Sequence, residues 1–257
     1  MIALLSALLV APASAFDLEG GNAYEGHRIG QATHLTGIGL YNRFVVGPDG
    51  GTNSIVLVSR YGQEDFSFAI GLPVAAHRTP MGRAIDMGNL ELSGFYHLGE
   101  IGPLFHSVGL EAHVNVGDRA YTWVNDPEEL WPGGGANVVY QGQMDLDSMV
   151  LLFRGTIGGS AAADFAPYPS AFMRVSGAAA IDYAVMNWVG VIGEMHVSYW
   201  DTSPWELSGM VRLDAVEGVR ARAGIVLPIG VWAGLAPTSR PAGVRETTLM
   251  LDVSLAF

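Results

Sequence analysis

The C-terminal residues 245–257 alternate between apolar and polar side chains with a period of two. The apolar set occupies the odd positions, namely Leu249, Leu251, Val253, Leu255 and Phe257. The even positions are small or polar for the most part, namely Thr248, Met250, Asp252, Ser254 and Ala256. Such a period predicts a β-strand with one apolar side, which is buried or faces lipid, and one side of mostly small or polar residues.

Similar alternation recurs in short runs along most of the chain, and no run keeps a helical period. About twelve strands are predicted in this way. They cover residues 31–45, 52–61, 66–72, 87–98, 103–116, 137–146, 149–157, 170–182, 189–199, 205–215, 219–227 and 245–257. The chain is therefore expected to be all-β.

Short and long connections alternate between these runs. The short ones are 62–65, 99–103, 147–148, 183–188 and 216–218, and the longer ones are 46–51, 72–86, 117–136, 158–169, 200–204 and 228–244. A transmembrane barrel has short turns at its periplasmic end and longer loops outside, whereas a soluble sandwich has no reason to sort its loops by length. The pattern predicts a transmembrane antiparallel up-and-down β-barrel of about 12 strands, with both termini periplasmic.

Both ends of the chain are expected to carry targeting signals. Residues 1–15 are an apolar run followed by an A-x-A pattern at Ala13 and Ala15, which predicts a signal peptide cleaved before Phe16, although no Lys or Arg precedes the run. The barrel would then cover residues 16–257. The last strand, which ends on Phe257, resembles that of bacterial outer-membrane β-barrels. This resemblance implies that Phe257 is an insertion signal read by the barrel-assembly machinery, and that Gram-negative outer-membrane lipid and lipopolysaccharide surround the protein.

A second resemblance covers residues 60–73, which read R-Y-G-Q-E-D-F-S-F-A-I-G-L-P. The stretch is similar to the R-Y-G-x-x-D-x-x-x-x-x-G-L-P hairpin of a broad transporter-like family of outer-membrane proteins. Some members of that family are linked to the uptake of aromatic compounds. The resemblance implies a transport role without a substrate. Tyr-Gly at a turn with Asp after it is also what any tight periplasmic hairpin favours.

Charged residues within the strands fall on the face opposite the apolar stripe. An Arg that faced lipid at mid-depth would cost about 2–4 kcal/mol, so this face is expected to line the lumen. The predicted lumen and solute-pathway residues are Glu91, Glu111, His113, Arg154, Arg174, Glu194, His196, Arg212, Asp214, Arg220, Arg222 and Asp252. Two interpretations remain open: a water-filled path that selects solutes, or a set of salt bridges that fills a narrow barrel.

The turns also predict which of these residues lie opposite one another. They place Glu91 opposite Glu111 and Asn89 opposite His113, across a three-residue loop at 100–102. Two close carboxylates need an Arg or a bound cation between them.

Further along the chain, the turns place Gln141 opposite Arg154, Asp214 opposite Arg220 and Arg212 opposite Arg222. The last two form a like-charge pair that Asp214 offsets in part. A cluster of arginines facing water would attract an anionic solute.

Other classes of function have little support in the sequence. The net charge of −12 argues against a nucleic-acid partner. No G-x-S-x-G, H-E-x-x-H or G-x-x-x-x-G-K-[ST] motif is present, and His106 and Ser107 are neighbours in one strand and point to opposite faces. We therefore expect no enzyme activity, cofactor or metal. The predicted function is a channel or transporter for small solutes. The alternative is a closed barrel that acts through its extracellular loops, above all 117–136 with Trp123 and Trp131.

Overall fold

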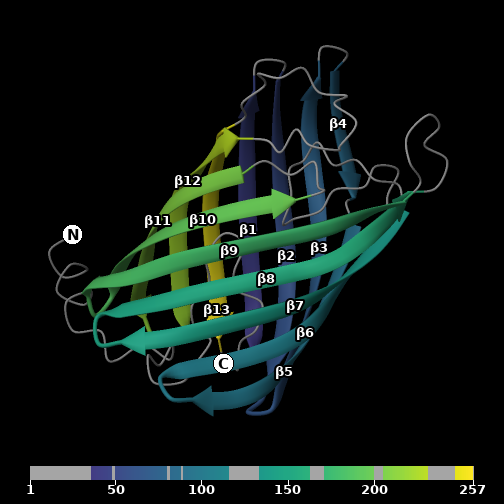
Figure 1. Ribbon diagram of the computed structural model, residues 1–257. Coiled ribbons are helices and arrows are strands. Elements are labelled where there is room, and N and C mark those ends of the chain that lie inside the picture. The colour runs from purple at the N-terminus through teal and green to yellow at the C-terminus, as the bar shows by residue number, and fades with distance from the viewer. Residues whose placement is uncertain are drawn as a thin grey trace, which may run out of the picture.

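The computed structural model describes residues 36–47, 50–79, 82–87, 89–115, 133–162, 171–199, 205–230 and 247–256. Within these ranges thirteen strands form one antiparallel sheet, and the pairing of β2 with β3 closes it into a barrel (Figure 1). The strands are β1 (Gly37–Gly47), β2 (Gly50–Gly62), β3 (Phe66–Thr79), β4 (Gly82–Met87), β5 (Asn89–Ile101), β6 (Leu104–Asn115), β7 (Gly133–Leu146), β8 (Met149–Ala162), β9 (Ala171–Met186), β10 (Val189–Tyr199), β11 (Trp205–Val216), β12 (Val219–Gly230) and β13 (Thr247–Ala256).

Two of the strands share one position in the barrel wall. β4 and β5 follow each other along the chain, and both pair with β3, at residues 74–79 and 66–71 respectively. The thirteen strands therefore occupy twelve positions around the barrel, as the sequence predicts. Each remaining strand pairs with its neighbours in the chain, and β1 pairs with β13.

The outer surface of the barrel is an apolar belt. On β2, β6 and β13 the side chains of Leu57, Leu110 and Leu251 are 54%, 62% and 59% exposed, while the residues next to them point inward and are buried or half-buried. Such exposure of large apolar side chains would be a liability in water and is the expected outer face of a membrane-spanning barrel. The alternation seen in the sequence thus separates a lipid-facing side from an inner side.

Tight turns join the strands at the end where β1 begins and β13 ends. Gly102 and Gly218 have φ values of 65° and 72° in the β5–β6 and β11–β12 turns, a conformation that only glycine adopts readily. Asp147 takes the same left-handed region in the β7–β8 turn, with φ 48°. The short connections predicted from the sequence are confirmed at these positions.

The prediction of longer connections at 72–86 and 46–51 is wrong. β3 runs on to Thr79 and pairs with β4 from Val74↔Met87 to Thr79↔Gly82, and β1 and β2 pair as far as Gly47↔Gly50. Pro73 and several glycines interrupt the alternation here, so the pattern alone gives strands that are too short. These long strands make the β1–β4 side of the barrel taller than the rest (Figure 1).

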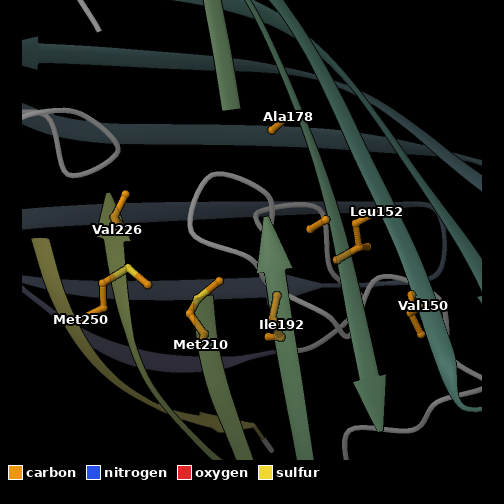
Figure 2. Close-up of a cluster of buried hydrophobic side chains, with 8 residues drawn as sticks. Val150, Leu152, Ala178, Ile192, Met210, Val226 and Met250 are labelled. Carbon is orange, nitrogen blue, oxygen red and sulfur yellow. The ribbon is translucent and has the colours of Figure 1, made fainter. Parts of the chain in front are cut away.

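The interior also contains apolar side chains. Figure 2 shows Val150, Leu152, Ala178, Ile192, Met210, Val226 and Met250, which with Ala180 form one buried cluster across β8–β13. The alternation of the sequence predicts a polar interior, on the assumption that the large apolar residues face lipid. The cluster shows that part of the inner wall is packed instead.

Candidate functional site

The predicted lumen residues that the structure describes all face inward. Most of them are buried at 2–8% exposure: Glu111, His113, Arg154, Glu194, His196, Arg212, Asp214, Arg220, Arg222 and Asp252. Glu91 lies on the same face and is half-buried. The side chain of Arg174, the whole of Phe257 and residues 1–15 lie outside what the structure describes, so these predictions stay as they are.

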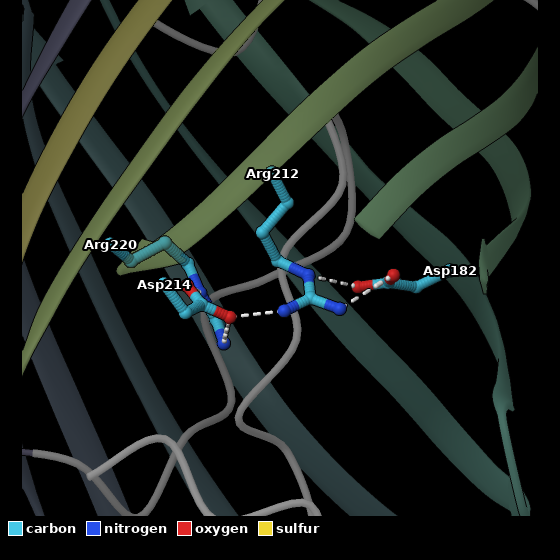
Figure 3. Close-up of polar contacts among 4 residues, drawn as sticks. All are labelled: Asp182, Arg212, Asp214 and Arg220. Atoms are coloured by element: carbon cyan, nitrogen blue, oxygen red, sulfur yellow. Dashed lines mark hydrogen bonds and ion pairs between the residues drawn. The ribbon is translucent and has the colours of Figure 1, made fainter. Parts of the chain in front are cut away.

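A chain of four charged side chains joins β9, β11 and β12 near the short-turn end (Figure 3). Arg212 donates two hydrogen bonds to Asp182, from Nε at 2.8 Å and from Nη2 at 3.0 Å, and its Nη1 donates to Asp214. Arg220 then holds Asp214 through Nε at 2.7 Å and Nη2 at 3.1 Å. These paired contacts match the planar fork of the guanidinium to a carboxylate, which fixes its orientation. The predicted proximity of Asp214 and Arg220 is confirmed by this ion pair.

Gly190 on β10 makes room for this network. A Cβ atom added there would lie 2.5 Å from Nη2 of Arg212 and 2.8 Å from Oδ1 of Asp182. The guanidinium can cross from β11 to Asp182 on β9 because the strand between them has no side chain at that point.

Replacing Gly190 by Ala is expected to displace the Arg212 guanidinium and lower the free energy of unfolding by about 1–3 kcal/mol. Gly193→Ala on the same strand is the matched control, since a Cβ there meets nothing within 4 Å. Denaturant unfolding of the two variants in detergent micelles measures the difference. Equal stability of the two would contradict the role given to Gly190.

Tyr41 on β1 lies among three arginines. The guanidinium carbons of Arg43, Arg60 and Arg222 are 5.8, 5.3 and 5.8 Å from the centre of its ring, and Arg60 also donates a hydrogen bond to its hydroxyl. Distances of this size are those of cation–π contacts. Asp252 on β13 accepts hydrogen bonds from Arg43 and, at 3.0 Å, from Arg222.

These two groups form a continuous wall that we call the arginine belt. It consists of Arg43, Arg60, Arg212, Arg220 and Arg222 with Asp182, Asp214 and Asp252. Arg212 and Arg222 lie directly opposite each other on β11 and β12, as the sequence analysis predicts. Five arginines stand against three aspartates in this set, so the belt itself carries a net positive charge.

The β5–β8 wall holds a second ion pair. Arg154 of β8 donates to Oε2 of Glu111 on β6, and Gln141 lies opposite Arg154 as predicted. The prediction that Glu91 lies opposite Glu111 is wrong, and so is that of Asn89 opposite His113.

The register of β5 against β6 gives the correct partners. Glu91 pairs with His113, and Ser93 pairs with Glu111. Asn89 pairs with Asn115. The cause is a register irregularity between His97 and Gly99, together with a loop that contains two residues rather than three. The faces are unchanged, because the shift moves the register by an even number of residues.

Further acidic residues lie on β10 and β11, toward the long-loop end. His196 Nδ1 and Glu206 Oε2 are 4.0 Å apart, and Glu194 lies one inward position closer to the turn. The described inner wall thus has an arginine-rich end near the tight turns and an acidic region farther along. The apolar cluster lies between them on β10 and β11.

One pair of chemically suggestive residues is not predicted from the sequence. His97 Nδ1 and Ser107 Oγ are 2.9 Å apart across β5 and β6, and both face inward. His106 and Ser107 do point to opposite faces, since His106 contacts the hydroxyl of the outward Tyr140. Ser107 is fully buried at 0% exposure, so its hydroxyl is not accessible to a substrate in this structure. Only the register, which the bulge determines, could have revealed the His97–Ser107 pair.

The described residues contain no group of three or more His, Asp or Glu side chains arranged to hold a metal ion. They also contain no helix long and apolar enough to cross a membrane.

Several solved outer-membrane barrels have a similar fold. The NanC porin superposes with a TM-score of 0.60 at 9% identity, over 85% of this chain and 100% of that chain. An outer membrane channel from Pseudomonas putida F1 gives 0.58 at 12% identity, over 88% and 97%. The KdgM porin in complex with disordered oligogalacturonate gives 0.53 at 10% identity, over 85% and 99%. No protein-family model matches the sequence, and no curated protein sequence matches it. The likeness is one of fold, and with the apolar belt it supports a place in the bacterial outer membrane.

Proposed function

We propose that this protein is an outer-membrane channel for small solutes, and that the arginine belt gives it a preference for anions. The observation that carries the proposal is the set of five inward arginines against three aspartates on the inner wall, four of the arginines being buried, enclosed by a lipid-facing apolar belt. Burying these charges costs free energy, and the field of the excess arginines would attract anions. The porin and channel folds of the similar structures support the same conclusion.

The surroundings of the channel follow from the same reasoning. Outer-membrane lipid and lipopolysaccharide would contact the apolar belt, and the barrel-assembly machinery would insert the chain by its last strand and Phe257. The resemblance of residues 60–73 to a transporter-like family supports uptake. The apolar cluster on β8–β13 would accommodate the apolar part of a solute such as an aromatic compound.

A second candidate function has one specific observation in its favour. Many inward side chains of the described wall are almost fully buried, including Gln141 at 1% and Arg220 at 2% exposure. Such burial is expected of a narrow barrel closed by its own side chains, which would act through its loops. Conductance distinguishes the two functions.

In a planar lipid bilayer, the refolded protein is expected to give discrete current steps and a reversal potential that favours anions in a KCl gradient. Arg60→Gln is expected to lower the anion-to-cation permeability ratio about tenfold, because a unit charge about 6 Å away in water is worth about 0.7 kcal/mol and acts with opposite sign on the two ions. Arg60→Lys, which keeps the charge, is the matched control. An inserted protein without current steps would exclude the open channel, and equal selectivity of the two variants would exclude the role of the belt.

A further inference from the structure

The outer face of β1 and β2 carries two amide side chains within the apolar belt. Tyr41 and Arg43 on β1 are inward and buried, so Asn42 between them faces outward. On β2 the same alternation turns Asn53 outward, two residues before the exposed Ile55. The other Asn and Gln side chains that the structure describes within strands face inward, namely Asn137, Gln141 and Gln143.

Lipid-facing apolar side chains surround Asn42. Leu40 and Phe44 are the outward residues on either side of it along β1, and both are large exposed side chains. Leu251 on β13 and Ile55 on β2 lie directly opposite Asn42 on the two neighbouring strands, and both are also exposed. The apolar belt therefore continues on all four sides of this amide.

The depth of Asn42 follows from the aromatic side chains at the short-turn end. The ring of Tyr61 on β2 is centred 6.1 Å from that of Phe66 and 5.3 Å from that of Phe68, and all three are outward. Such aromatic residues mark the membrane interface. Ile55 lies six residues farther along β2, which at about 3.3 Å per residue and a tilt of about 40° is about 15 Å along the membrane normal. Asn42 lies beside Ile55 and thus well inside an apolar band about 25 Å tall.

An amide at this depth needs a partner that lipid tails cannot provide. The side chain of Asn42 has two donor hydrogens and an acceptor oxygen. The hydrocarbon core contains no water that could bind them, and leaving them unpaired there costs free energy. Within the described part of the chain, the one hydrogen bond of Asn42 outside the strand ladder is accepted by its main-chain carbonyl, from Arg43 Nη1 at 3.1 Å. A partner for the amide must therefore come from another molecule that spans the membrane.

A second copy of the chain meets this requirement by symmetry. Two barrels related by a twofold axis along the membrane normal present each residue at the same depth. The amide of Asn42 then meets its own counterpart, and each amide can donate to the oxygen of the other. Asn53 lies diagonally next to Asn42, one outward position beyond Ile55, and extends the same polar strip toward the long-loop end.

We propose that the outer face of β1 and β2 is an interface between two copies of this chain in the membrane, and that paired Asn42 amides hold it together. The large apolar residues around Asn42 would pack against those of the second copy. The interface lies on the outside of the barrel, so it does not depend on the proposed channel.

Förster resonance energy transfer between copies of the refolded protein in lipid vesicles tests the proposal. The chain has no Cys, so Glu217→Cys in the exposed β11–β12 turn gives a single site for donor and acceptor dyes. Transfer that rises with the protein-to-lipid ratio and saturates is expected for the labelled chain. Asn42→Leu should weaken association about tenfold, as for the loss of two amide hydrogen bonds within a membrane. This variant should fold at least as well in lipid, because Leu suits a lipid-facing position.

Two further variants serve as controls. Asn42→Gln keeps the amide and should retain association. Ile157→Ala should leave association unchanged, because Ile157 is outward on β8, on the far side of the barrel from β1.

The proposal fails if transfer stays at the level of randomly distributed monomers at every protein-to-lipid ratio. It also fails if Asn42→Leu associates as tightly as the unaltered chain. An equal loss of association in Ile157→Ala would indicate clustering without a defined face and would reject the interface as well. Conductance is measured separately, so a dimer without current would reject the channel alone, and current from a monomer would reject the interface alone.

Discussion

Replacing Arg212 by Met is expected to lower the free energy of unfolding by about 3–5 kcal/mol, because it leaves the buried carboxylate of Asp182 without its arginine and takes one of two arginines from Asp214. Asp182 loses both of its hydrogen bonds from Arg212, and it is 1% exposed. Asp214 keeps Arg220 and loses the bond from Arg212. Urea unfolding in micelles, followed by tryptophan fluorescence, measures the change.

Met210→Leu is the control for this experiment. Met210 lies two residues away on the inner face of β11, and a volume-conserving change there should cost less than about 1.5 kcal/mol. The double variant Asp182→Asn with Arg212→Met should be less destabilised than the sum of the two single changes, since both remove the same contact. Additive effects, or an Arg212→Met variant as stable as the control, would contradict the network shown in Figure 3.

The second large loss of stability is expected when a charge is placed on the outer surface of the barrel. Leu57 lies near the middle of β2, points away from the lumen and is 54% exposed. Leu57→Arg should destabilise the barrel in lipid vesicles by about 2–4 kcal/mol, the cost of Arg at the bilayer midplane.

Val216 is the matched position for this test, because it is 56% exposed and ends β11 at a tight turn. Val216→Arg should cost about 0–1 kcal/mol, as expected near the interface. Equal costs in lipid would contradict the membrane depth assigned to β2. In detergent micelles the stability losses of the same two variants should differ less, because detergent rearranges around a charge more easily than a bilayer does.

The sequence allowed the barrel to be predicted because its two faces differ chemically along every strand. Period-two alternation identifies strands such as β13, and turn residues such as Gly218 and Asp147 identify the short-turn end. Inward placement of Arg212 and Asp252 follows from the same parity. The face on which a side chain lies depends only on whether its position is odd or even, so a register error of an even number of residues does not change it.

Contacts between strands could not be predicted with the same success. The irregularity between His97 and Gly99 moves Glu91 away from Glu111 and brings His97 to Ser107, and nothing in the local alternation signals it. The bonds from Arg212 to Asp182 depend on the absent side chain at Gly190, on the strand between them, and the pattern of a single strand does not reveal this.

The position of Asp252 has a consequence for how the barrel closes. β13 is made last and pairs with β12 on one side and with β1 on the other. Arg222 of β12 and Arg43 of β1 bind the same carboxylate from the two sides. Until the first and last strands meet, Arg43 cannot reach Asp252. The guanidinium of Arg43, which lies inside the finished barrel, then lacks the carboxylate of Asp252 as a partner. Closure of the sheet and pairing of Arg43 with Asp252 are therefore one event, and an open barrel is penalised both by unpaired strand edges and by an unneutralised arginine.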